Sequence, residues 1–301
     1  MAITDLIEEY LLVWVLLAVG IGIVMPQVAV LTRVSVPILA IMIGSISLTL
    51  TIAQFQRVRA RSIGLVLLGH AAMPAIAFGV ARLLGLSAEL TIGFVVLAAV
   101  TPELVTPVMT ELAGGQTALA TVALVLIGIG SIGFTPAAVV VLGGGIDLAV
   151  GRIVEQLAVA VVVPMTVAIG VRARWPDRVG RYEEYYPSVS AVMVVLIIGA
   201  VTGANATVLR DGGWGLLAIG IGAATINGIG YLLGWTLARR GSRSERIATM
   251  LSVGMRDFAI AAGLIVAAGL PTVAALPAIV FGIIEMASSA GLARYLTPSN
   301  G

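Results

Sequence analysis

The sequence contains no cysteine and no lysine, and only 11% of its 301 residues are charged. The absence of cysteine excludes disulfides, thiolate metal sites and cysteine nucleophiles. Aromatic residues make up 5% of the chain, so no stacking site stands out by composition. The basic N-terminal region of a secretory signal is also missing, because Asp5, Glu8 and Glu9 occupy that place. We therefore expect the first apolar run to be retained as a helix.

Hydrophobic residues fill the chain instead, at 59% of the sequence and a mean hydropathy of +1.11. Such values are far from those of a soluble domain. A bilayer core of roughly 30 Å needs about 20 apolar residues per helix. Apolar runs bounded by Arg, Pro or Gly predict about ten spans, near 11–31, 36–53, 62–85, 88–110, 117–142, 152–171, 187–204, 214–238, 246–268 and 272–293. The sequence predicts an all-α membrane protein whose single transmembrane domain covers residues 1–301.

The arginines predict the orientation of these spans, because cytoplasmic loops are enriched in basic residues. The even-numbered loops carry Arg57, Arg59, Arg61, Arg172, Arg174, Arg178, Arg181, Arg239, Arg240, Arg243 and Arg246. The odd-numbered loops carry only Arg33, Arg82, Arg152 and Arg210. This bias predicts a multi-pass protein of the cell (inner) membrane with both termini in the cytoplasm. Because the arginines lie in short loops between spans, they do not indicate a nucleic-acid partner.

About ten spans divide into two groups of five, and an odd number per half forces opposite orientation if the halves are related. We expect inverted repeats over about 11–142 and 152–293. Each half has one interrupted span. The fourth contains Pro102 and Pro107 around Glu103, and paired prolines unwind a helix. The ninth contains Gly254 followed by Arg256 and Asp257. Broken helices that cross near the midplane form the binding sites of many transporters, whereas a single proline kink would be harmless.

Four stretches resemble the bile acid:sodium symporter family, and their order and spacing cover nearly the whole chain. They are IGSISLTL at 43–50 with QFQR at 54–57; MP at 73–74 with ARLLGL at 81–86; PVMT at 107–110 with LA at 112–113 and AL at 118–119; and VGM at 253–255. The resemblance implies a transporter that moves organic anions with sodium through ten helices. It also implies a set of sodium ligands on the third, fourth, fifth and ninth spans.

Those ligands do not carry over to this chain. The Ser-Asn pair that the family has on the fourth span reads Thr106 and Pro107 here, and two hydroxyl positions on the fifth span read Ala120 and Leu124. The third-span glutamine falls at or beside Gly69. The ninth-span Glu, Gln and Asn fall on Ser252, Arg256 and Asp257, on either side of Met255. Hard cations need several converging oxygens. These positions argue against sodium as the coupling ion and leave the proton as the alternative.

Arg256 is the most informative departure, because an arginine at the centre of a membrane helix costs at least about 2.5–3.5 kcal/mol. It must therefore have partners. We expect its guanidinium to be held by Glu103, with Asp257 as a second candidate, so that the side chain replaces a bound cation. The alternative is a buried ion pair that only sets the crossing of two helices.

Other polar residues of the spans have two interpretations each. His70 could move protons, since its ordinary pKa is near 6.5, but a hydrogen bond to a neighbouring helix is the simpler role. Asn227 lies among small residues and is expected to join helices, with a place in the transport pathway as the alternative. Glu155 and Glu285 are either embedded or near an interface. No nucleophile is paired with a base, so we expect no enzyme and no cofactor.

The sequence thus predicts a secondary active transporter of a small organic anion, such as a bile-acid-like compound or a keto acid, that works by alternating access. Its expected partners are this substrate and the lipid bilayer, and its oligomeric state is open. One alternative is a proton-coupled or uncoupled exporter of another metabolite. A second is a membrane sensor or channel that does not transport.

Overall fold

A computed structural model describes residues 10–50, 58–143 and 150–296. These residues are almost entirely helical, and no strand occurs among them. Eight of the described helices are long and apolar enough to cross a membrane, and Leu11–Val24 and Ala88–Ala99 are two shorter apolar helices. This arrangement confirms the predicted class, a multi-pass all-α membrane protein. The resemblance stretch at 54–57 lies outside the described residues.

The elements follow the predicted spans closely. In the first half they are α2 (Leu11–Val24), η1 (Pro26–Val34), α3 (Ser35–Ser47), α4 (Ala60–Leu83), α5 (Ala88–Ala99), α6 (Thr106–Leu112) and α7 (Thr117–Leu142). The second half begins with α8 (Val150–Leu157), η3 (Ala158–Val162), α9 (Val163–Arg174), α10 (Pro176–Gly180), η4 (Glu183–Tyr185) and α11 (Tyr186–Ala204). It continues with α12 (Ala206–Asp211), α13 (Trp214–Leu237), α14 (Arg243–Gly254), α15 (Phe258–Ala267), η5 (Thr272–Ala275) and α16 (Leu276–Leu296).

The boundary between the first two predicted spans was wrong. The sequence reading placed one span at about 11–31, whereas α2 ends at Val24 and a continuous helical stretch runs over Pro26–Ser47. Pro26 causes the difference, because proline has no N–H to continue the hydrogen bonds of a preceding helix and disfavours helical geometry in the residue before it. The first apolar helix is therefore shorter than a full crossing.

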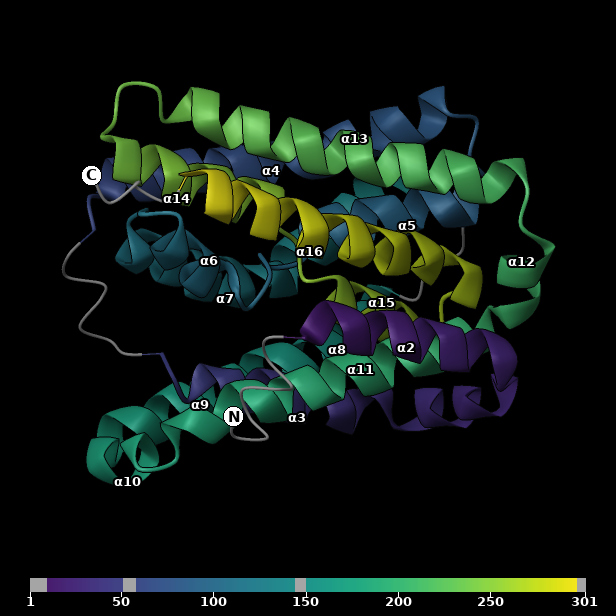
Figure 1. Cartoon of the computed structure of the whole chain (residues 1–301), viewed down its shortest axis with the longest axis horizontal. Coiled ribbons are helices and arrows are strands. Elements are labelled where there is room, and N and C mark those ends of the chain that lie inside the picture. The colour runs from purple at the N-terminus through teal and green to yellow at the C-terminus, as the bar shows by residue number, and fades with distance from the viewer. Residues whose placement is uncertain (1–9, 51–57, 144–149, 297–301) are drawn as a thin grey trace.

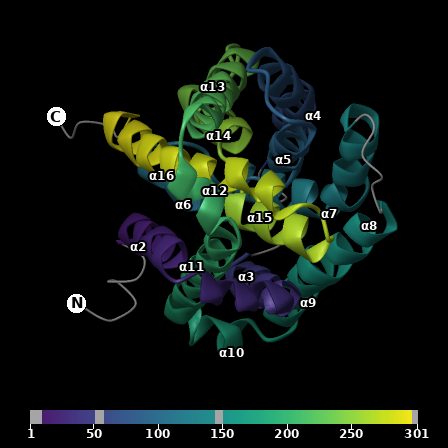
Figure 2. The same ribbon diagram turned by 90° about the vertical axis from the view of Figure 1, so that its right-hand side faces the viewer.

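Two layers of helices make up the molecule (Figures 1 and 2). One layer contains α4, α5, α13, α14 and α16, with α6 and α7 packed against α14, and the other contains α2, α3, α9 and α11. Helix α15 lies between them and contacts α5 and α16 on one side and α3 and α11 on the other. The cavity described below opens between these two layers.

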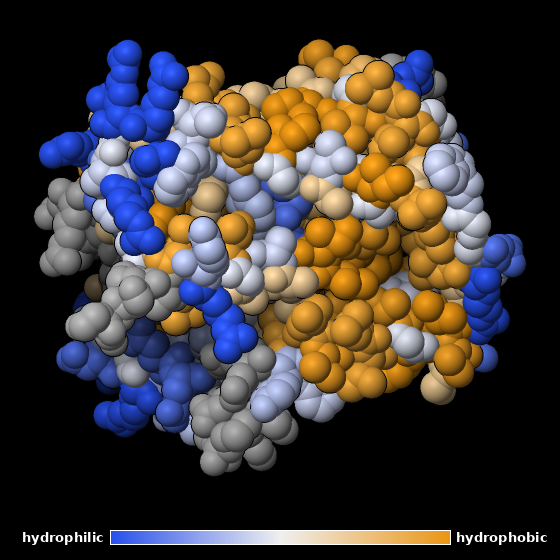
Figure 3. Space-filling view, turned by 45° about the horizontal axis from the view of Figure 1, so that its top comes forward, coloured by the Kyte–Doolittle hydropathy of each residue, from blue (hydrophilic) through white to orange (hydrophobic). Residues whose placement is uncertain are grey.

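The connections alternate between two ends of the molecule. The link from α9 to α11, which contains α10, and the turn from α13 to α14 lie at one end, and the α4–α5 turn and α12 lie at the other (Figure 1). Hydrophilic residues gather at the first end, and hydrophobic residues cover much of the middle (Figure 3). The predicted sixth-to-seventh and eighth-to-ninth loops thus lie opposite the third-to-fourth and seventh-to-eighth loops, across an apolar band.

Glycines allow α13 and α14 to pack closely. A Cβ atom at Gly234 would lie 2.5 Å from the carbonyl oxygen of Thr249, and one at Gly230 would lie 2.7 Å from the Cα of Gly254. Small residues let helix backbones approach in this way. The contact fixes the end of α14, where the ninth predicted span breaks, against the middle of α13.

Candidate functional site

Both predicted interruptions are confirmed. Helix α5 ends at Ala99 and α6 begins at Thr106, so residues 100–105 are not helical. Pro107 lies in the first turn of α6, where its missing N–H costs nothing. Helix α14 ends at Gly254, and Met255 is extended (φ −82°, ψ 139°) before α15 begins at Phe258.

The two breaks contact each other. The backbone N–H of Asp257 donates to the carbonyl oxygen of Thr101 over 3.0 Å. Helix α7 supports the same region, because Thr135 Oγ1 donates to the carbonyl oxygen of Ala99 over 3.0 Å. Irregular backbone inside a membrane protein is tolerated where protein groups satisfy it in this way. The broken helices therefore meet, as the sequence predicted.

Arg256 is fully buried in the second break. Its guanidinium donates to the carbonyl oxygen of Val253 over 2.9 Å and to Nδ1 of His70 on α4. A guanidinium only donates, so Nδ1 must accept and the imidazole carries its proton on Nε2. The His70 ring also packs on Phe134 of α7, with the ring centroids 5.3 Å apart. Arg256 thus joins α14 to α4 through a charged hydrogen bond.

The expected pairing of Arg256 with Glu103 or Asp257 was wrong. Among the described residues the ion pair that forms is Arg172 with Glu183, at 2.9 Å. The extended backbone at Met255 explains the difference, because successive side chains of an extended segment point to opposite sides. Arg256 turns toward α4, whereas Asp257 turns toward α15 and accepts the N–H of Ile260 over 2.8 Å as its N-cap.

Three buried carboxyl groups lie on the other side of the break. Glu103, Asp257 and Glu285 are at most 5% exposed. The Asp257 N–H binds the Thr101 carbonyl two residues before Glu103, and Gly282 of α16, one turn before Glu285, lies against Phe258 beside Asp257. Neither oxygen of Glu285 has a hydrogen-bond partner within the described ranges, nor does Oε2 of Glu103 or Oδ2 of Asp257. Glu285 is thus embedded, whereas Glu155 on α8 is exposed. Burial of an unpaired charge is costly, which makes this cluster a candidate to hold protons.

Asn227 on α13 connects three elements. Its Nδ2 donates to the carbonyl oxygen of Gly254 over 3.2 Å, and its Oδ1 accepts from Oγ of Ser288 on α16 over 2.7 Å. The helix-joining role expected of Asn227 is confirmed. The same amide satisfies the last carbonyl of α14, which the break leaves without a helical partner. Ser288 was missed by sequence reasoning, because one hydroxyl in an apolar helix carries no pattern.

The positions where the resemblance implied sodium ligands are mostly apolar and closely packed. Ala120 and Leu124 are buried, and a Cβ at Gly69 would lie 2.7 Å from the Val253 side chain. Thr106 and Ser252 retain hydroxyl oxygens, both buried and without a partner in the described part of the chain. Within that part no group of three or more His, Asp or Glu side chains is arranged to hold a metal ion.

A cavity of about 410 Å³ opens between the two layers. Helices α3, α6, α7 and α11 supply most of its walls, and Glu103 from the first break and Pro107 from the start of α6 lie among the lining residues. Glu111 and Glu183 add two more carboxyl groups, and no arginine is among the described residues that line it. Arg256, His70 and Asn227 do not line this cavity. The volume is that of a small-molecule site.

Together, the apolar helices, the two broken helices in contact and the cavity beside them define a multi-pass membrane protein with the architecture of a secondary transporter. The family model of the Sodium Bile acid symporter family matches residues 36–211, and the chain belongs to this family. It is also similar to the "Uncharacterized sodium-dependent transporter YocS" of Bacillus subtilis (strain 168), with 27% identity over 226 residues. That similarity covers 74% of this chain and 69% of the relative. The chain is therefore a membrane transporter, as the resemblance implied.

Proposed function

We propose that this protein is a secondary active transporter that moves a small organic anion by alternating access, as one domain of about ten spans in two inverted repeats. Several observations support the proposal. The chain runs in opposite directions through the α5–α6 and α14–α15 pairs (Figure 1). A backbone hydrogen bond joins the two breaks. The cavity lies where two layers of helices meet. Movement of one layer against the other would open it to alternate sides.

The observation that carries our view of coupling is the position of Arg256. Its buried guanidinium binds the Val253 carbonyl, at a place where the family resemblance implies a sodium ligand. A cation fixed to the chain cannot be released on the other side of the membrane. We therefore propose that Arg256 permanently replaces a bound cation and that the protein does not use the usual sodium sites.

The buried carboxyl groups favour the proton as the coupling ion in place of sodium. Within the described ranges no arginine pairs with Glu103, Asp257 or Glu285, and Arg256 contacts His70 instead. The neighbouring Tyr231 hydroxyl contacts Ser288. An uncompensated buried carboxylate costs several kcal/mol, so we propose that the cluster holds protons. Glu103 also lines the cavity. An anionic substrate would enter that cavity only beside a protonated Glu103, which would make substrate and proton move together.

We expect uptake into proteoliposomes to be unchanged when sodium is replaced by potassium and to be accelerated by an inward proton gradient. The Glu103→Gln variant should lose this dependence on the proton gradient, because its amide cannot bind and release a proton. Glu155→Gln is the matched control, since Glu155 is exposed on α8 and lies outside the cavity. A steep, cooperative dependence on sodium would show that the coupling proposal is wrong.

The carboxyl groups of the cavity also favour a second candidate, an exporter of a neutral or weakly basic amphiphile. Glu103 and Glu111 would repel an anion that enters without a proton, whereas the charge of Glu183 is balanced by Arg172. Counterflow in proteoliposomes with a labelled bile acid, a labelled keto acid and a labelled neutral amphiphile separates these candidates. A thermal-shift screen with the same compounds gives an independent readout, because a ligand that binds the folded state raises its melting temperature. A sensor or channel would show no saturable counterflow with any compound.

Cysteine labelling tests the orientation, and the natural absence of cysteine leaves no background. We propose that the arginine-rich end is cytoplasmic, in the cell (inner) membrane. Cysteines that replace Arg59 or Arg178 should then react with an impermeant maleimide only in inverted vesicles. A cysteine at Asp211, exposed at the opposite end on α12, should react in intact cells. The reverse pattern of labelling would reverse the orientation.

A further inference from the structure

Six arginines gather where α4 begins, where α13 ends and where α14 begins. They are Arg59, Arg61, Arg239, Arg240, Arg243 and Arg246. Two of them have structural partners: Arg243 donates to the carbonyl oxygen of Leu296 over 2.7 Å, and Arg246 stacks 3.7 Å from the Trp235 ring centre. The side chains of Arg61, Arg239 and Arg240 have no hydrogen bond, ion pair or ring contact within residues 10–50, 58–143 and 150–296.

These three arginines share a basic pocket where α4 begins and α13 ends. It has a volume of about 330 Å³ and is lined by Arg61, Thr236, Leu237, Arg239 and Arg240. No acidic residue of the described chain lines it. An arginine near the C-terminus of α13 is favoured by the helix dipole, but Arg61 lies in the first turn of α4, where the dipole opposes a cation. The stability of the helices therefore does not explain why Arg61 faces Arg239 and Arg240.

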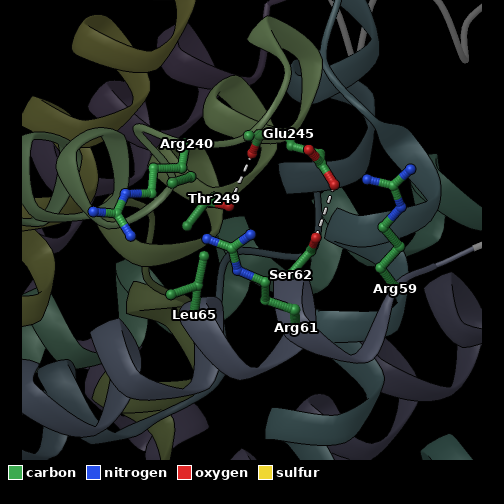
Figure 4. A pocket seen from close by; sticks show the side chains of 9 residues that line it. Arg59, Arg61, Ser62, Leu65, Arg240, Glu245 and Thr249 are labelled. Carbon is green, nitrogen blue, oxygen red and sulfur yellow. Dashed lines mark hydrogen bonds between the residues drawn. The ribbon is translucent and has the colours of Figure 1, made fainter.

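The carboxylate of Glu245, beside this pocket, already accepts hydrogen bonds from other groups. Glu245 accepts from Ser62 Oγ over 2.8 Å and from the Ser242 N–H over 2.8 Å, in the capping box that begins α14. A smaller adjoining pocket is lined by Arg59, Arg61, Arg240 and Glu245, and Figure 4 shows Arg61 and Arg240 on one side of the Ser62–Glu245 hydrogen bond and Arg59 on the other. The positive charge of the basic pocket thus remains available to an anion.

An apolar surface continues from this pocket toward the middle of the molecule. Leu65 lines the smaller pocket, and Leu68, one turn further along α4, is 57% exposed. On α13, Leu232 lies one turn before Thr236 and is 63% exposed. A ligand with an anionic head and an apolar body matches a basic pocket that is followed by an apolar surface. A basic pocket between helices at a membrane surface is the feature that binds anionic lipid head groups.

We propose that Arg61, Arg239 and Arg240 bind the phosphate of an anionic phospholipid, whose acyl chains lie along α4 and α13. Guanidinium groups suit this role because they donate several hydrogen bonds to one phosphate. The lipid would hold α4 against α13. Helix α4 carries His70 and α13 packs on α14 through its glycines, so the site lies on the helices that position Arg256. This proposal does not depend on the substrate or on the coupling ion.

Native mass spectrometry of the full chain from nanodiscs that contain phosphatidylglycerol and phosphatidylcholine tests the proposal. We expect phosphatidylglycerol to be retained by the natural protein and its affinity to fall about fivefold for each arginine removed, so roughly 25-fold in Arg61→Gln/Arg240→Gln. The double variant Arg178→Gln/Arg181→Gln is the matched control. It removes the same charge from exposed positions at the same end of the molecule.

Melting temperature in detergent gives a second readout that does not need the mass spectrometer. Added phosphatidylglycerol should raise the melting temperature of the natural protein and of the control variant but not that of Arg61→Gln/Arg240→Gln. Equal loss of lipid in both double variants would show that general surface charge holds the lipid, and it would contradict the proposed site. An equal rise with millimolar inorganic phosphate would overturn the lipid as ligand and leave a simple anion site.

Discussion

Replacing Arg256 with glutamine is expected to abolish coupled transport while the protein stays folded. The substitution removes two hydrogen bonds from a charged donor, to the Val253 carbonyl and to His70. Hydrogen bonds to charged groups contribute about 1.5–3 kcal/mol each. If the conformation that transports loses roughly this stabilisation, turnover should slow about a hundredfold or more.

Folding should change much less than transport. Arg256 has no carboxylate ion pair within the described ranges, so its charge is buried without direct compensation. A buried charge without an ion pair carries a desolvation cost of several kcal/mol, and a neutral amide relieves this cost, which offsets the two lost hydrogen bonds. The melting temperature of Arg256→Gln should therefore equal or exceed that of the natural protein. Glutamine also places at this position the amide that the family resemblance implies.

Transport by Arg256→Gln should be measured as counterflow, beside Arg256→Lys and Arg181→Gln. The lysine keeps the charge but lacks the planar fork, so it should retain part of the activity. Arg181 is exposed far from the breaks, and its variant should transport normally. Normal counterflow by Arg256→Gln would show that Arg256 only joins α14 to α4. A large fall in its melting temperature, absent in Arg256→Lys, would assign the charge to stability.

The second large effect is expected at Gly234 on α13. A methyl group there would lie 2.5 Å from the Thr249 carbonyl oxygen and 2.6 Å from the Met250 Cα, which are backbone atoms of α14. The helices must separate to admit it, and overpacking of this kind costs about 1–3 kcal/mol. We expect Gly234→Ala to lower the melting temperature clearly and to reduce transport, because α14 leads into the break.

Gly228 is the matched control on the same helix, because a Cβ there meets nothing within 4 Å. Gly228→Ala should leave the melting temperature unchanged or raise it, since alanine in a helix interior is favoured over glycine by up to about 1 kcal/mol. Thermal unfolding of both variants in one detergent compares them directly. Equal melting temperatures would mean that α13 and α14 do not need their close approach.

The apolar spans and both breaks could be predicted from the sequence, because each depends on local chemistry. A bilayer requires long apolar helices, prolines at 102 and 107 interrupt one of them, and Gly254 permits the other interruption. The first span is the exception, because Pro26 ends it earlier than its apolar run predicts. The greater number of arginines in the even-numbered loops is likewise visible in the sequence.

Contacts between distant residues depended on the tertiary structure. Met255 is extended, so Arg256 meets His70 instead of Glu103, and no sequence pattern predicts that turn of the backbone. The burial of Glu285 depends on the neighbours of α16, and the pocket of Arg61 depends on where α13 ends. The sequence alone thus determined that the chain forms apolar membrane helices and where two of them break, through hydrophobicity and backbone restriction. Packing in three dimensions decided which buried charges face one another.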